Sequence, residues 1–177
     1  MKSIFESLYS VVQRLTWLGV LVVAWGLSPV MTVAHEADGA QSHATVQVWD
    51  ESTWGQLKQT GPKPAAYLFT TTYCSTCVEA YETLHHHVEK THTTSGVTPW
   101  MSVVMMDVAG VKAQHHASHF HGLNTLYAFE GYEPAVRASV DPQWPDVTPY
   151  ILLVDRQGKV QKILGQPSAK NLTQWLR

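Results

Sequence analysis

AAYLFTTTYCSTC, the stretch at residues 65–77, decides the fold of this chain. Its first eight residues, Ala65–Thr72, form a short apolar and β-branched run that is typical of a buried strand. Beyond them, apolar residues recur at spacings of four, three and four, on one face of a helix expected to end near Lys90: Cys77, Tyr81, Leu84 and Val88. The sequence therefore predicts that both cysteines stand at a strand-to-helix junction.

Cys74 and Cys77 are the only cysteines of the chain, and three roles compete for them. A structural disulfide closing so short a loop contributes only about 2 kcal/mol in the chain-entropy model. A zinc site lacks the second pair of cysteines that would complete it. A thiol near a helix N-terminus faces unpaired N–H groups and the positive end of the helix dipole, which favour the thiolate that attacks disulfides. Redox exchange is the role that spacing and position favour.

The two cysteines are not equivalent in this arrangement. Cys74 lies at or before the first helical turn, so we expect it to be exposed and to form the mixed disulfide with a partner. Cys77 lies on the apolar face, so we expect it to be shielded and to resolve that mixed disulfide. The sequence thus predicts Cys74 and Cys77 as catalytic residues that alternate between a disulfide and a dithiol.

Further strands and helices are expected on both sides of this junction. A strand at Thr45–Trp49 leads into a short helix, capped by Asp50 or Ser52, that ends near Gly61. The segment Val111–Val147 is expected to be helical at first and then irregular or only briefly regular, because it contains three prolines. The other expected elements are a buried strand at Met101–Asp107, a hairpin of Thr148–Asp155 and Lys159–Leu164, and a final helix with Pro167 in its first turn.

Residues 45–177 resemble the thioredoxin superfamily. The resemblance rests on the strand, the Cys74-Ser75-Thr76-Cys77 motif and the following helix, and on Thr148-Pro149 at the start of the hairpin. It implies an α/β fold with a central mixed sheet flanked by helices. It also implies that Pro149 is cis and faces the cysteines, and that the backbone of Thr148 pairs with the substrate as a transient extra strand. Tyr73, which precedes the first cysteine, is expected to contact the substrate as well.

Within the superfamily, the chain looks most like the exported TlpA-type thiol–disulfide oxidoreductases. These proteins carry an insertion between the third strand and the cis-proline, as residues 111–147 would here. They also end in a strand–D-x-x-G-K–strand hairpin similar to Asp155–Val160. The resemblance implies a periplasmic reductase that exchanges electrons with protein partners and with a membrane or periplasmic electron donor.

Several positions depart from the family pattern. Tyr73 stands where a Trp is common, and Ser75-Thr76 replaces the usual Gly-Pro or Pro-Pro pair. Leu68 occupies the position of the buried Asp of thioredoxin. Glu79 and Glu82 are expected to be solvated helix residues, with proton transfer as their alternative role. These departures leave the redox potential and the direction of electron flow open.

The first 34 residues have the pattern of a targeting segment. From Leu15 to Ala34 there are twenty residues without a charge, and Arg14 precedes them. The apolar part, Trp17–Leu27, has the length of a secretory signal, and Thr32-Val33-Ala34 offers small residues for cleavage. The alternative is an uncleaved membrane anchor. Either interpretation places residues 45–177, after a flexible lead-in at residues 35–44, in the periplasm or another extracytoplasmic compartment.

Ten histidines are many for a chain with twelve Lys and Arg residues. His115 and His119 would share one face of a helix, a spacing that can hold a metal. Copper is the candidate ion, because imidazole and thiolate both suit it. A copper-binding or copper-delivery protein is therefore the alternative function.

The aromatic residues and the net charge complete the predictions. Trp49, Trp54 and Trp175 are expected in the core, and Trp144 either lines the rim of the site or packs in the core. A net charge of −2 leaves no basic surface for nucleic acid. Taken together, the sequence predicts an exported thiol–disulfide oxidoreductase of the reductase type, without an organic cofactor.

Overall fold

A computed structural model describes residues 45–96 and 98–177 of the chain. The predicted buried strand is β2 (Ala65–Thr70), and it lies inside a six-stranded sheet with the order β1-β4-β3-β2-β5-β6. The first four strands in this order are parallel, whereas β5 is antiparallel to β2 and β6 is antiparallel to β5. The remaining strands are β1 (Val46–Trp49), β3 (Trp100–Met105), β4 (Thr125–Phe129), β5 (Tyr150–Val154) and β6 (Val160–Leu164).

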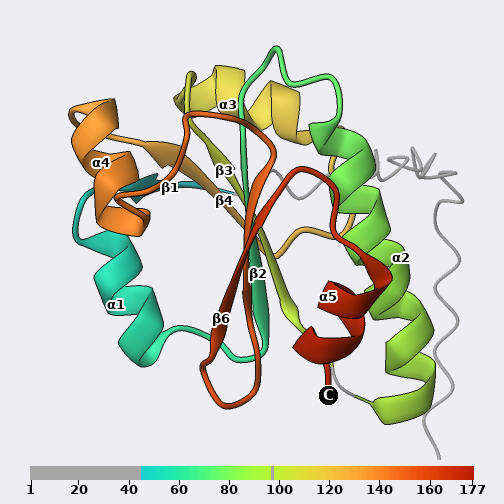
Figure 1. Cartoon of the computed structure of the whole chain (residues 1–177). Coiled ribbons are helices and arrows are strands. Elements are labelled where there is room, and N and C mark those ends of the chain that lie inside the picture. The colour runs from blue at the N-terminus through green and yellow to red at the C-terminus, as the bar shows by residue number, and fades with distance from the viewer. Residues whose placement is uncertain (1–44, 97) are drawn as a thin grey trace, which may run out of the picture. The chain divides into compact units, whose positions relative to one another are not determined.

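Helices cover both faces of this sheet. On one face lie α2 (Cys77–Ser95), α3 (Gly110–Ala117) and α5 (Ala169–Trp175), and on the other lie α1 (Thr53–Thr60) and α4 (Glu133–Val140) (Figure 1). The predicted fold class, a thioredoxin-like mixed sheet flanked by helices, is confirmed.

Alternating side chains of the strands fill two cores, one on each side of the sheet. In β2, Ala66 and Leu68 face the core under α2, whereas Tyr67 and Phe69 face the core under α1 and α4. All six residues of β2 are buried, as expected of a strand with neighbours on both sides and helices on both faces. The expected core positions of the three tryptophans are confirmed: Trp49 and Trp175 are 0% exposed and Trp54 is 3% exposed.

The second part of the inserted segment is briefly regular, which is one of the two predicted outcomes. It forms β4 and α4 and then has no helix or strand in residues 141–149, although the sequence did not show where these two elements would lie. Residues 125–129 (TLYAF) pair with β3 on one side and with β1 on the other, so the insertion adds a strand to the middle of the parallel half. Pro134 does not interrupt α4, because it lies in the first turn, where a helix needs no backbone N–H donor.

The last helix begins slightly later than predicted. Ser168 is the N-cap of α5, so Pro167 precedes the helix and does not lie in its first turn. Ser168 and Asn171 form a capping box, in which each side chain accepts a hydrogen bond from the backbone N–H of the other.

No helix in the described part of the chain has both the length and the apolar composition needed to cross a membrane. The expectations for the targeting segment at residues 1–34 and for the lead-in at residues 35–44 fall outside the described residues.

Candidate redox site

The two cysteines are joined by a disulfide at the amino end of α2. Their Cα atoms are 5.5 Å apart. Cys77 is the first residue of α2 and is 1% exposed, since it packs in the core with Tyr81 and Leu84. Cys74 lies two residues before the N-cap, Thr76, and is only partly buried. The pair therefore has one accessible sulfur and one shielded sulfur, although Cys74 contacts the core more than the sequence predicted.

The loop that carries Cys74 is held from both sides. The N–H of Cys74 donates to the carbonyl oxygen of Thr71 (3.2 Å). The N–H of Thr72 donates to the two carboxylate oxygens of Asp107 (3.1 and 3.0 Å), and its hydroxyl donates to Oδ2 (2.5 Å). On the opposite side, Nε2 of Gln166 donates to the carbonyl oxygen of Thr76 (3.3 Å). These contacts fix the backbone before and after the cysteines.

Asp107 was not among the residues predicted for the site. It follows β3, which pairs with β2 along its whole length, so the register places Asp107 beside the segment after Thr70. An acidic residue just beyond the carboxyl end of a buried strand was the signal in the sequence. What the sequence did not show was that β3 is the direct neighbour of β2.

Pro149 lies beside the point at which the chain leaves β2 for the cysteines. Tyr150 pairs with Phe69 in the antiparallel register, so Pro149 stands next to Thr70. The Thr148–Pro149 peptide bond is cis. The carbonyl oxygen of Pro149 accepts a hydrogen bond from the N–H of Gly165 (2.9 Å). Within the described residues, by contrast, neither the N–H nor the carbonyl oxygen of Thr148 has a hydrogen-bond partner.

Exposed apolar side chains gather at the cysteine end of the sheet. Tyr73 is 80% exposed next to Cys74. Strands β2, β3, β4 and β6 run in one direction, and β5 runs in the opposite direction. The cysteine end of the sheet is therefore also reached by the connections after β3 and β4, by the segment before β5 and by the last residue of β6. These segments contribute four more exposed large apolar residues: Val111, Tyr132, Val147 and Leu164.

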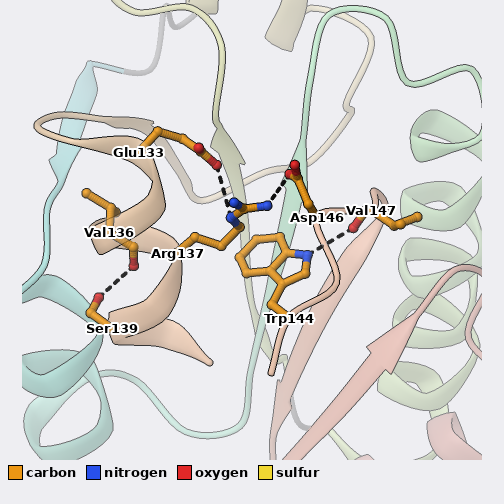
Figure 2. Close-up of polar contacts among 7 residues, drawn as sticks. All are labelled: Glu133, Val136, Arg137, Ser139, Trp144, Asp146 and Val147. Atoms are coloured by element: carbon orange, nitrogen blue, oxygen red, sulfur yellow. Dashed lines mark hydrogen bonds and ion pairs between the residues drawn. The ribbon is translucent and has the colours of Figure 1, made fainter. Parts of the chain in front are cut away.

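Trp144 packs in the core and does not line the rim of the site. It is 7% exposed, and its ring stacks on Tyr150 with the centroids 4.1 Å apart and meets the edge of Phe69 at 4.9 Å. Its indole Nε1–H donates to the carbonyl oxygen of Val147 (3.0 Å; Figure 2). Of the two expected positions for Trp144, the core is therefore the one observed.

Asp141 holds the start of the segment that leads to Pro149. Its carboxylate accepts hydrogen bonds from the Tyr150 hydroxyl (2.6 Å) and the Gln143 N–H (3.1 Å), and Nζ of Lys162 lies at 2.9 Å. Burial raises the pKa of this carboxyl, but these three partners outweigh burial and leave the pKa below its ordinary value. Ionised Asp141 therefore stabilises the folded state.

An Asp141→Asn variant will be less stable than the wild type at pH 7, and the difference will shrink below about pH 4. A carboxyl with a lowered pKa in the folded state stabilises that state above the ordinary Asp value of about 3.9, and this stabilisation is lost as the pH falls through the folded-state pKa. Urea unfolding at pH 7 and at pH 3 measures the effect.

Glu51→Gln is the control for Asp141→Asn, because Glu51 is exposed and makes no contact of this kind in the described structure. Its free energy of unfolding should equal that of the wild type at both pH values. A deficit of Asp141→Asn that stayed constant between pH 7 and pH 3 would show that ionisation of Asp141 does not stabilise the fold.

The surroundings of Cys77 contain no carboxylate at the position expected from thioredoxin. Leu68 is fully buried there, and Glu79 and Glu82 are exposed helix residues. Tyr81, which the sequence predicts on the apolar face of the helix, lies one turn after Cys77 and brings a polar atom into the core. The hydroxyl of Tyr81 is buried without a hydrogen-bond partner in the described structure, and burial raises its pKa.

The histidines are arranged differently from the pair that the copper hypothesis names. The prediction that His115 and His119 share a helix face is wrong, because α3 ends at Ala117 and His119 lies in the following turn. The ring of His119 instead lies 5.6 Å from that of His116. Across the described residues, no group of three or more His, Cys, Asp or Glu side chains is placed to hold a metal ion.

Neither a family model nor a curated protein matches the chain. Among solved structures, it is similar to a secreted disulfide oxidoreductase of Mycobacterium tuberculosis described as homologous to E. coli DsbE, with 16% identity over 63% of this chain and 78% of that one (TM-score 0.45). It is also similar to MTB dsbF, with 22% identity over 64% of this chain and 81% of that one (TM-score 0.44). A third similar structure is a thiol-disulfide isomerase from Corynebacterium glutamicum, with 17% identity over 63% of this chain and 77% of that one (TM-score 0.46).

The geometry of the described residues identifies the fold. A mixed sheet lies between two layers of helices, the bonded cysteines stand where β2 gives way to α2, and a cis-proline opens the neighbouring antiparallel strand. This chain has the fold of the thioredoxin superfamily.

Proposed function

We propose that this protein is an exported thiol–disulfide oxidoreductase that reduces disulfides of protein partners. The observation that carries the proposal is the bonded pair at the amino end of α2, in which Cys74 is accessible and Cys77 is buried. A thiolate at Cys74 would lie near the unpaired N–H groups at the start of α2, which favour the charged form.

The exchange takes place in two steps. The Cys74 thiolate attacks one sulfur of the partner disulfide, the partner S–S bond breaks, and the other partner sulfur leaves as a thiolate. The Cys77 thiolate then attacks Cys74, which forms the Cys74–Cys77 disulfide and releases the second partner sulfur. Two electrons pass to the partner, whose two thiolates take up protons from solvent. A protein dithiol restores the reduced pair by the reverse steps.

The surface around the cysteines favours a protein partner over a small molecule. The unpaired backbone of Thr148 offers hydrogen bonds to an extended chain, as in the addition of a strand. The exposed side chains of Tyr73 and Val147 offer apolar contacts next to it. The apolar targeting pattern before residue 35 supports a periplasmic or equivalent compartment, and the TlpA-like motifs support reduction as the direction.

Redox titration against glutathione tests both the activity and its direction. We expect the Cys74–Cys77 pair to equilibrate at a strongly negative potential, close to the thioredoxin value of about −270 mV, and the protein to catalyse reduction of insulin by a small dithiol. Cys77→Ser is the control, since it cannot form the internal disulfide. A potential near that of DsbA, about −120 mV, would contradict the reductase direction. Absence of any catalysed exchange would contradict the function.

A further inference from the structure

The last residues before the cis-proline differ in how they are held. The carbonyl oxygen of Val147 accepts a hydrogen bond from Trp144, whereas the backbone of Thr148 has no partner in the described structure. The Val147 side chain is 48% exposed. A partner chain that pairs with Thr148 would therefore meet a short segment whose own conformation is set by the residues just before it.

Arg137 of α4 contacts this segment from the insertion. The guanidinium lies between two carboxylates: its Nε is 3.1 Å from Oε1 of Glu133, one turn earlier in α4, and its Nη1 forms an ion pair with Asp146 (Figure 2). Val136 and Val140 of the same helix are buried in the core, which fixes the position of α4. The contact thus joins a firmly packed helix to the loop before the active-site strand.

The pair is better placed than an ordinary surface ion pair. Ion pairs between fully exposed side chains contribute little, because water screens them and both side chains lose rotamer freedom. The Arg137 side chain is only 15% exposed, so packing has already restricted it, and its planar fork meets two carboxylates. Asp146 is 73% exposed, so Arg137 is what restrains its side chain.

Asp146 also has an unusual backbone. Its φ is +57°, and it is the single non-glycine residue of the described chain with a positive φ. An aspartate adopts this left-handed conformation less readily than a glycine does. The ion pair with Arg137 restrains the side chain of the residue that makes this turn. The direction in which Val147 and Thr148 leave the turn depends on that conformation.

We propose that Arg137 is a positioning residue for partner binding: through Asp146 it fixes Val147 and Thr148 in the conformation that a partner chain pairs with. This inference rests on the proposed exchange with protein disulfides. The contacts of Arg137 are with Glu133 and Asp146 and with neither cysteine in the described structure, so it acts on binding of the partner and not on the transfer between sulfurs. A preorganised docking segment raises affinity because the partner does not have to order it.

The test compares a protein substrate with a small disulfide. Arg137→Gln should raise KM for insulin about five- to thirtyfold, as expected from lost preorganisation, with kcat within twofold of the wild type. Reduction of a small aromatic disulfide, which cannot pair with Thr148, should change less than twofold. Amide hydrogen exchange of Thr148 should be faster in the variant, which a change confined to the cysteines would not produce.

Two more variants make the comparison specific. Glu133→Gln removes the other carboxylate and leaves the loop contact, so its KM should equal that of the wild type. Asp146→Asn changes an exposed side chain, which leaves the core intact, and should reproduce the effect of Arg137→Gln. The double variant should be no worse than either single variant, because both remove the same contact.

The failure of this inference can be told from the failure of the proposed function. Equal KM values for wild type, Arg137→Gln and Asp146→Asn in an active enzyme would overturn the role of Arg137 alone. Equal losses on insulin and on the small disulfide would also overturn it, because they would indicate a general structural effect. A wild type without Cys74-dependent exchange would overturn the proposed function, and this inference with it.

Discussion

A Cys74→Ser variant will reduce protein disulfides at least about 1,000-fold more slowly than the wild type. The thiolate is the nucleophile of disulfide exchange, and a serine hydroxyl at this position cannot replace it. The buried Cys77, which is 1% exposed, is not accessible enough to take over the attack. Cys77→Ser will lose turnover for a different reason, because it forms the mixed disulfide with a partner and cannot resolve it. Insulin reduction and non-reducing gels measure the two effects.

The control for these variants is Ser75→Ala, between the two cysteines. Ser75 is exposed and makes no side-chain hydrogen bond in the described structure, so its activity should remain within about threefold of the wild type. Retention of more than a tenth of the activity by Cys74→Ser would contradict the assignment of Cys74 as the attacking residue. Failure of Cys77→Ser to accumulate any mixed disulfide would contradict the resolving role.

Trp49→Ala will lower the free energy of unfolding by about 3–5 kcal/mol, the usual range for removing a buried Trp. Trp49 is 0% exposed, and four aromatic rings surround it at centroid distances of 5.0 to 6.5 Å: Trp54, Tyr67, Phe69 and Tyr127. These rings belong to three elements, α1, β2 and β4, so the cavity would weaken the contacts of all three with β1. Urea unfolding followed by tryptophan fluorescence and by circular dichroism measures the loss.

Val48→Ala is the matched control for Trp49→Ala. Val48 precedes Trp49 in β1, points to the opposite side of the sheet because side chains alternate along a strand, and is 49% exposed. Its free energy of unfolding should change by less than about 1 kcal/mol. Similar losses for the two variants would mean that the aromatic cluster is not a major source of stability.

The sequence was sufficient to predict those elements whose apolar pattern lies within a short stretch of the chain. Residues 65–69 form an uninterrupted apolar run, and Cys77, Tyr81 and Leu84 recur at helical spacing. Both elements, and the position of the cysteines at their junction, could therefore be predicted. The shielding of Cys77 followed from the same periodicity. The hairpin of β5 and β6 was also predictable, because turn residues separate two short apolar runs.

What the sequence could not show depends on contacts between distant segments. The role of Asp107 follows from the pairing of β3 with β2, which no local pattern reveals. Residues 125–129 were not recognised as a strand, because a run of five residues, four of them apolar, is also compatible with a buried helix. The contact between Arg137 and Asp146 joins a helix to a loop nine residues later, and nothing in the spacing of the two charges predicts it.

The place of β4 between β1 and β3 has a consequence for the order in which the chain can fold. Among the described strands, β1 lies at the edge of the sheet and pairs with β4 alone. The paired residues Val46 and Leu126 are 80 positions apart in the chain. During synthesis, β1 has no strand to join until residues 125–129 have emerged. Closing so long a loop has an entropic cost, which opposes folding until the pairing of β1 with β4 has formed and stabilises the sheet. We therefore expect β1 to join the sheet late, after β2 and β3 have already positioned the cysteines.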